Sequence, residues 1–232
     1  IAVVRLPHIS NFTDFIPLEQ HPLLSVRYVQ TARELGAPDL VILPGTKNTV
    51  GDLLWLRQSG LEAALLKLAA DGTPVLGVCG GYQMLGQTLD DSQGTESGRP
   101  QTLRGLGLLP TQTIFTADKR RAQIEASAAA PFAGAALTGY EIHTGRTAVQ
   151  GAPFCTHADG TSEGCVQGTV FGTYLHGLFD SGELTERLLE GLAERQVHAT
   201  FFVCGYRIAE FPDTLSHIAA AGHEIGLHSS NH

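Results

Sequence analysis

The sequence predicts an α/β fold in which a mostly parallel sheet is flanked by helices. The apolar runs Ile1–Val4, Asp39–Leu43 and Pro74–Leu76 are continuous rather than alternating, as in strands buried on both faces of a parallel sheet. Helical patterns follow the second and third runs, and strands that alternate with helices indicate parallel βα units. Such sheets bind ligands at the carboxyl ends of their strands, so we expect the functional residues in the loops found there.

The other elements of the first half follow from local patterns. Weak alternation over Ser25–Gln30 predicts another strand, and Pro7–Pro17 predicts a polar loop before it. Leucine and alanine at helical spacing predict helices at Val50–Arg57 and Leu61–Asp71. The stretch Pro74–Leu85 predicts a strand, a glycine turn and a helix in succession.

The middle of the chain, Gly94–Gln167, is rich in glycine and threonine and predicts an antiparallel segment. Its expected strands are Leu103–Pro110, Gln112–Thr116 and Leu137–Thr147, with a surface loop at Ala126–Ala136. Beyond this segment, Val166–Leu175 predicts one strand, and Glu183–Arg195 predicts an amphipathic helix.

Composition excludes several classes of partner. The 232 residues, 43% of them hydrophobic, are enough for one sizeable core or one domain plus an appendage. With a net charge of −8 and no basic run, we expect no nucleic-acid partner, and the absence of a long apolar stretch predicts no membrane partner. Four scattered cysteines without a CxxC pair indicate a reducing cytoplasm. The chain begins at Ile1 inside an apolar run and ends among histidines, so we expect both ends to be cut.

The segment Gly77-Val78-Cys79-Gly80-Gly81 carries the strongest functional signal. It places a cysteine where a buried strand turns sharply into a helix, and its glycines are needed where a β-carbon would collide with neighbouring backbone. A helix N-terminus also favours a thiolate. We interpret Cys79 as a nucleophile, while the alternative is an inert, buried cysteine.

His176 is the natural partner of Cys79, because it ends a predicted strand and therefore faces the same sheet edge. A cysteine and a distant histidine base suit acyl transfer, although a structural histidine is the alternative. The backbone N–H groups of Gly45, Thr46 and Gly80 follow buried strands and could form an oxyanion hole; ordinary strand-to-helix turns would look the same.

Several motifs occur together in a fixed order: Val4–Asp14, Pro44–Thr49, Gly77–Gly86, Gly139–His143 and Tyr174–Gly177. Over about residues 1–195 they resemble the class I glutamine amidotransferase domain of the cobyric acid synthase family. The resemblance implies a flavodoxin-like sheet. It also implies that Cys79 attacks the side-chain amide of L-glutamine, forming a thioester and releasing ammonia.

The resemblance also implies partners and supporting residues. Gln83 joins the oxyanion and substrate-binding set, and Glu141 and His143 are possible supporting residues. No cofactor is expected in this domain, whereas ATP and Mg²⁺ are expected in a synthetase domain that amidates corrinoid carboxylates in cobalamin biosynthesis. That synthetase half would precede Ile1 and is absent from the sequence.

One position departs from the wider class. Most class I amidotransferases carry a carboxylate two residues after the histidine, and Leu178 stands there in this chain. The resemblance implies a cobyric or cobyrinic acid branch that lacks this carboxylate. The group that orients His176 is left unassigned.

Residues 196–232 follow a different pattern. Ala199–Val203 predicts a strand and Pro212–Ala221 a helix, and His228 and His232 would share one face of a helix. Two ligands are too few for a tight zinc site, so these histidines are weak metal candidates. The segment resembles a fragment of the polysaccharide deacetylase family without that family's Asp-Asp motif. We expect two parts joined near Leu189–Val197: an amidotransferase domain at 1–195 and a partial segment at 196–232 that is not an independent domain.

Three functions are therefore open. We favour a glutamine-hydrolysing enzyme that uses Cys79 and His176, tested by loss of ammonia release on replacing Cys79. The second is a metal-dependent polysaccharide or chitooligosaccharide deacetylase, which would release acetate. The third is a catalytically inactive binding domain with an amidotransferase fold, in which Cys79 would not react with a glutamine mimic.

Overall fold

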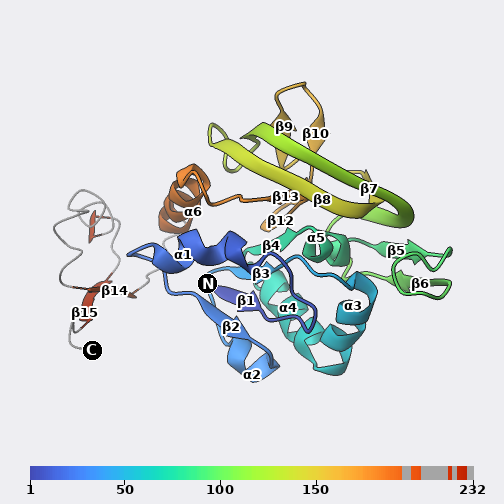
Figure 1. The fold of residues 1–232 in the computed structure, drawn as a ribbon. Helices are drawn as coiled ribbons and strands as arrows, with labels where there is room; N and C mark the ends of the chain where they lie inside the picture. Colours follow the sequence, from blue (N-terminus) through green and yellow to red (C-terminus); the bar gives the residue numbers. More distant parts are fainter. Residues whose placement is uncertain (195–199, 205–218, 221–223, 229–232) are drawn as a thin grey trace.

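The computed structural model describes residues 1–194, 200–204, 219–220 and 224–228 (Figure 1). A six-stranded sheet forms the centre, in the order β11-β12-β4-β3-β1-β2. The bounds of these strands are β1 Ala2–Val4, β2 Arg27–Val29, β3 Val41–Leu43, β4 Val75–Val78, β11 Cys165–Gln167 and β12 Val170–Thr173.

This central sheet confirms the predicted fold class. All its pairings are parallel except the one between β11 and β12. Among the parallel strands the sequence order is 2-1-3-4-5, which is the flavodoxin-like arrangement. The strands β1, β3, β4 and β12 are buried along their whole length, which explains their unbroken apolar runs.

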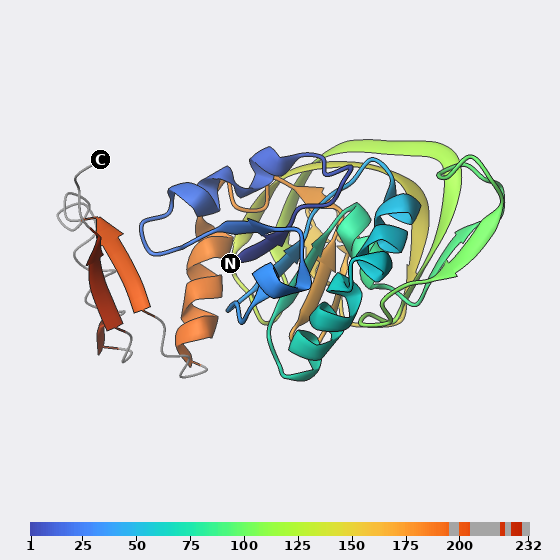
Figure 2. The same cartoon turned by 90° about the horizontal axis from the view of Figure 1, so that it is seen from below.

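Helices cover both faces of this sheet. The bounds are α1 Ile16–Gln20, α2 Ala32–Leu35, α3 Thr49–Gln58, α4 Leu61–Ala70, α5 Gly80–Leu85 and α6 Glu183–Glu194, with a 3₁₀ turn, η1, at Phe12–Phe15. Leu184 of α6 packs with Leu76 and Phe171, whereas Tyr82 of α5 packs over Gly172. Because successive strand residues point to opposite faces, α5 and α6 lie on opposite sides of the sheet (Figure 2).

A second, mostly antiparallel sheet lies beside the first (Figure 1). Its long hairpin pairs β7 (Thr111–Ala128) with β8 (Ala136–Val149). The shorter strands are β5 Thr88–Asp91, β6 Gln101–Arg104, β9 Cys155–His157, β10 Ser162–Glu163 and β13 Leu175–His176. Through β13, which pairs with β8, this sheet reaches the end of the central strand β12.

The structure corrects several boundaries. Pro7–Pro17 is not wholly a loop, because η1 and the start of α1 occupy its second half, with a proline in the first turn of α1. Residues 105–110 are not a strand, and Ala126–Ala136 is a hairpin whose ends belong to β7 and β8. Val166–Leu175 is divided among β11, β12 and β13, because Gly168 has a φ of 58° that turns the chain back.

Among the described residues, the last two strands pair only with each other. β14 (Thr200–Cys204) and β15 (Glu224–His228) form a parallel two-stranded sheet. The predicted strand at Ala199–Val203 corresponds to β14, whereas most of the predicted helix Pro212–Ala221 lies outside the described residues. Within the described part of the chain, no helix combines the length and apolarity needed to cross a membrane.

Candidate functional site

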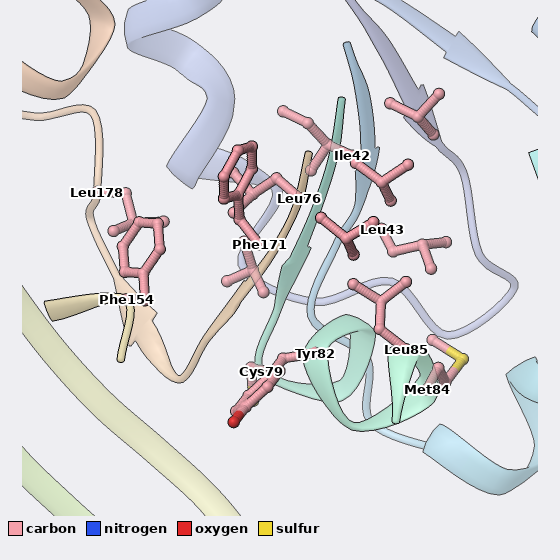
Figure 3. Packing of buried hydrophobic residues seen from close by; sticks show 14 of the residues in the cluster. Ile42, Leu43, Leu76, Cys79, Tyr82, Met84, Leu85, Phe154, Phe171 and Leu178 are labelled. Carbon is pink, nitrogen blue, oxygen red and sulfur yellow. The ribbon is translucent and has the colours of Figure 1, made fainter. Parts of the chain in front are cut away.

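Cys79 lies at a strained turn between β4 and α5 (Figure 3). Its φ of 52° and ψ of −109° place a non-glycine residue in a region that side chains avoid. The neighbouring glycines are sterically required. A β-carbon on Gly81 would lie 2.0 Å from the Leu43 carbonyl oxygen, and one on Gly77 would lie 2.7 Å from the Tyr82 nitrogen. The local geometry is that of the predicted elbow.

The Cys79 thiol is buried and protonated at neutral pH. Its backbone N–H donates to the Thr173 carbonyl at 2.8 Å, and Sγ lies 3.6 Å from the Ile142 carbonyl oxygen. Burial raises the pKa of the Cys79 thiol to about 12, against the lowering effect of the Gly80 backbone N–H. The effect of burial on the Cys79 pKa is thus larger than the opposite effect of the helix N-terminus, which favours a thiolate. A base is needed to activate this thiol.

His176 is held by a carboxylate that the sequence did not identify. Asp14 Oδ2 lies 2.6 Å from His176 Nδ1, and the pair is buried. Asp14 Oδ1 also accepts from the Gly177 backbone N–H at 3.4 Å, and Asn11 Nδ2 lies 3.1 Å from His176 Nδ1. The missing partner of the imidazole therefore comes from the loop after β1, in η1, and not from position 178, where Leu178 is buried in the core.

Cys79 and His176 face the same short stretch of β8. His176 pairs with Tyr140 in the β13–β8 ladder, and the two rings stack at a centroid distance of 5.2 Å. The Cys79 sulfur lies against Ile142, two residues farther along β8, a spacing of about 7 Å along a strand. The loops after β4 and β12 thus bring the two predicted residues to one edge of the sheet.

The proposed oxyanion loops meet beside these residues. A β-carbon on Gly45 would lie 3.1 Å from His176 Cε1, and one on Gly80 would lie 3.2 Å from the Thr46 nitrogen. The loop after β3 is fastened to the loop after β1, because Ser10 N–H donates to the Gly45 carbonyl at 2.8 Å. A β-carbon on Gly80 would also lie 2.6 Å from Thr46 Cγ2, so Gly80 leaves no free space for a side chain, whereas a β-carbon on Gly45 would crowd His176.

Gln83 lies next to this site with its side chain fully engaged. Its amide donates to the Thr144 carbonyl at 2.9 Å and to the Tyr174 hydroxyl at 3.1 Å. Its Oε1 accepts from the Thr49 hydroxyl at 3.1 Å. The side chain thus fastens α5 to β8 and to the start of α3, and its expected role toward substrate stays a prediction.

Glu96 is a second carboxylate that sequence reasoning missed. It comes from the turn between β5 and β6, and its Oε1 accepts from the Thr49 backbone N–H at 2.8 Å, at the start of α3. The Thr49 hydroxyl in turn would lie 3.1 Å from a β-carbon on Gly80, and the charge of Glu96 raises the pKa of Cys79. Asp14 lies in η1 and Glu96 in a turn, both away from Cys79 in the chain. Asp14 belongs to the motif Val4–Asp14, but no local pattern signals the contact of either carboxylate with the site.

Glu141 and His143 belong to a different environment from Cys79. They line a cavity of about 520 Å³ whose walls include neither Cys79 nor His176. Glu141 is paired with Arg120, and the His143 ring stacks on Tyr174 at 3.6 Å between centroids. Successive side chains of a strand point to opposite faces, so Glu141 and His143 lie on the other face of β8 from Tyr140, whose ring stacks on His176.

Only one of the two tail histidines is among the described residues. His228 ends strand β15 and so does not lie on a helix, and His232 falls outside the described residues. Their pairing at a metal therefore stays a prediction.

Comparisons with known proteins match this architecture. The model of the CobB/CobQ-like glutamine amidotransferase domain family matches residues 1–184, and the polysaccharide deacetylase model matches residues 172–232. The second match covers the tail and overlaps the end of the first.

Curated relatives are similar over most of the chain. A cobyric acid synthase from Synechococcus elongatus is 49% identical over 200 residues, and one from Citrobacter koseri is 50% identical over 210 residues. Each alignment covers 84% of this chain but only 40% and 41%, respectively, of the relative. The chain thus spans less than half the length of these relatives.

Solved structures share the fold at low sequence identity. A structure titled PurLQS from Thermotoga maritima has a TM-score of 0.61 at 17% identity, covering 82% of this chain and 97% of that one. A structure titled glutamine amidotransferase has a TM-score of 0.56 at 16% identity, covering 84% and 97%. At these identities the likeness concerns the fold.

Proposed function

The chain belongs to the family of CobB/CobQ-like glutamine amidotransferase domains, and from this premise we propose that it hydrolyses L-glutamine through Cys79 and His176. The observation that carries the proposal is the buried Asp14–His176 pair at the same sheet edge as the strained Cys79. A nucleophile, a base and a group that orients the base are the three parts that acyl transfer requires.

In the proposed reaction, the Cys79 thiol passes its proton to His176 Nε2 as the sulfur attacks the carbon of the glutamine side-chain amide. The tetrahedral intermediate then collapses to a glutamyl thioester, and the protonated imidazole gives its proton to the departing nitrogen, which leaves as ammonia. Water, deprotonated by the same imidazole, attacks the thioester and releases glutamate and the free thiol. Asp14 holds Nδ1 protonated, which leaves Nε2 unprotonated and able to act as the base.

The negative oxygen of the tetrahedral intermediate needs preorganised donors. We assign this role to the backbone N–H groups of Gly80 and of the Gly45–Thr46 loop, which lie against each other beside Cys79 and His176. The pKa of Cys79 already responds to the Gly80 N–H, so this donor points toward the sulfur. Such donors contribute about 3–4 kcal/mol each to transition-state stabilisation in other hydrolases.

We propose that Glu96 recognises the amino end of glutamine. Its carboxylate lies at the start of α3, close enough to influence Cys79 electrostatically. A carboxylate beside a reactive thiol does not aid thiolate formation, but it pairs with the α-ammonium group of an amino-acid substrate. We propose that Glu96 selects a free amino acid over a peptide amide.

The ammonia is proposed to serve an ATP-dependent amidation of corrinoid carboxylates in cobalamin biosynthesis. The support is the similarity to cobyric acid synthases, of which this chain covers about two fifths. ATP and Mg²⁺ belong to that synthetase reaction and not to the Cys79 site. The free, buried cysteines Cys79, Cys155 and Cys165 fit a reducing cytoplasm, which we propose as the location.

Ammonia release from L-glutamine tests the proposal. The wild-type chain is expected to form ammonia and glutamate in equal amounts, and Cys79→Ala to fall to the uncatalysed rate. Cys165→Ser is the matched control, because Cys165 is another buried, free thiol that lies elsewhere. Equal rates for wild type and Cys79→Ala would contradict the proposal.

A further inference from the structure

The hairpin β9–β10 carries three ligating side chains that the glutamine reaction does not use. Cys155, His157 and Glu163 each offer a ligand atom, and these atoms lie within 4.8 Å of one another. The ladder places Glu163 directly opposite Cys155, while His157 follows Cys155 by two residues on the same face of β9. We propose that these three side chains form a binding site for a zinc-class divalent cation.

This cluster differs from a group of exposed carboxylates because its side chains are buried and offer sulfur, nitrogen and oxygen ligands. Cys155 is fully buried, and His157 and Glu163 are 8% and 9% exposed. Thiolate, imidazole and carboxylate together are ligands that Zn²⁺ prefers, whereas Ca²⁺ and Mg²⁺ take oxygen ligands. Sγ of Cys155 and Oε2 of Glu163 lie 3.5 Å apart, close to the separation of two ligand atoms around one tetrahedral zinc ion.

His157 provides an independent indication of a ligand. Its buried Nε2 has no hydrogen-bond partner, although Glu141 Oε1 lies 3.4 Å away. Buried polar nitrogens are nearly always satisfied, so an orphaned imidazole nitrogen points to a missing group. His157 and Glu163 both line the cavity of about 520 Å³, which would give a bound cation a fourth, open position.

The surroundings hold the ligands in place. Glu163 Oε2 accepts from the Thr173 hydroxyl at 2.6 Å and Oε1 accepts from the Tyr174 backbone N–H at 2.7 Å, and these two bonds fix the position of the carboxylate. Glu141 Oε1 lies 3.4 Å from the same His157 Nε2, so this carboxylate is on the side of the ring where the cation would bind. On binding, the Cys155 thiol gives its proton to solvent and coordinates as thiolate.

Cobalt titration of the chelator-treated full chain tests the proposal, because a cysteine thiolate bound to Co²⁺ gives an intense charge-transfer band in the near ultraviolet. We expect one equivalent of Co²⁺ with this band, displaced by Zn²⁺, and one equivalent of zinc by elemental analysis. Cys155→Ser should abolish the band. His157→Gln and Glu163→Gln should weaken binding by about 10-fold or more.

Controls separate this site from other thiols and histidines. Cys165→Ser, Cys79→Ala and the double variant His228→Ala/His232→Ala should each retain the band and the stoichiometry. Circular dichroism shows whether Cys155→Ser folds; if it does not, His157→Gln decides. The proposal is overturned if wild type gives no band, if the band survives in Cys155→Ser, or if it disappears with Cys79→Ala or with the tail histidines.

Discussion

At the scale of single residues, Cys79 combines backbone strain with the proposed role of nucleophile. Its φ of 52° and ψ of −109° are held by the surrounding strands and by the glycines of the elbow. Such a conformation costs about 1–3 kcal/mol for a residue with a side chain. The same turn places the sulfur beside β8, so the strain and the placement of the nucleophile share one cause.

Replacing Cys79 by glycine should therefore relieve strain while abolishing ammonia release. We expect Cys79→Gly to exceed Cys79→Ala in free energy of unfolding by about 1–2 kcal/mol, because both lack the sulfur but only alanine keeps the strained β-carbon. Urea unfolding of the two variants measures the difference. A Cys79→Gly protein that is less stable than Cys79→Ala would show that the turn is not strained.

Asp14 should control the rate of the reaction more than the binding of glutamine. Asp14→Asn keeps the shape but no longer stabilises the imidazolium or holds its tautomer, so kcat should fall by about 10²–10⁴-fold with KM within a few-fold. Steady-state ammonia release measures both. Asp180→Asn is the matched control: Asp180 lies near Gly177 without a bond to the imidazole. Equal losses in the two variants would argue against an orienting role for Asp14.

The protonated state of Cys79 predicts a pH dependence. A thiol whose pKa is raised to about 12 holds its proton through neutral pH and yields more thiolate as the pH rises. In the absence of glutamine, alkylation of Cys79 by iodoacetamide should therefore increase about tenfold per pH unit between about pH 7 and 10. Peptide mass spectrometry measures the rate. A plateau already reached near neutral pH would instead indicate a resting thiolate–imidazolium pair.

At the scale of elements, the close approach of β3, β4 and α5 positions the elbow. Gly81→Ala would drive a β-carbon into the Leu43 carbonyl, so we expect a loss of about 1–3 kcal/mol of stability, together with reduced ammonia release. Gly191→Ala is the control, because this position within α6 has no atom within 4 Å of its would-be β-carbon. That variant should gain about 0.5–1 kcal/mol. Thermal unfolding distinguishes the two, and a stable, active Gly81→Ala would contradict the packing argument.

The elements were predictable where burial leaves a pattern. The strands β1, β3 and β4 read as apolar runs because both of their faces are covered. The long strand β7 was recognised only at its beginning, since its middle, around Asp118–Arg121, is exposed and charged and so shows no alternation. The short strands β11 to β13 were merged into one predicted strand, although the polar residues Gln167–Thr169 interrupt the apolar run where the chain turns.

The site was predictable only where motifs are local. The glycines around Cys79 and the strand before His176 indicated both residues directly. Asp14 lies 162 residues from His176 and meets it only because the loops after β1 and β12 end at one sheet edge. Asp14 is part of the motif Val4–Asp14, but the sequence did not indicate its contact with His176.

At the scale of the whole molecule, the described residues up to Glu194 contain both large sheets and every residue assigned to the glutamine reaction. Within the described part of the chain, strands β14 and β15 pair only with each other, and the relatives cited above match 84% of the chain.

We therefore propose that residues 1–194 are sufficient for folding and for ammonia release. A chain ended at Glu194 should keep its melting temperature within a few degrees and its kcat within about twofold. An unfolded or inactive product would show that the tail is part of the domain.

Mass spectrometry of the full chain after treatment with an electrophilic glutamine analogue tests the central claim most directly. It reports an assembled site even if ammonia release is slow. We predict one adduct per chain on Cys79, none on Cys155 or Cys165, protection by L-glutamine, and slower labelling in Asp14→Asn. Labelling spread over several cysteines, or unaffected by L-glutamine, would contradict the assignment of Cys79 and His176 as a glutamine-hydrolysing pair.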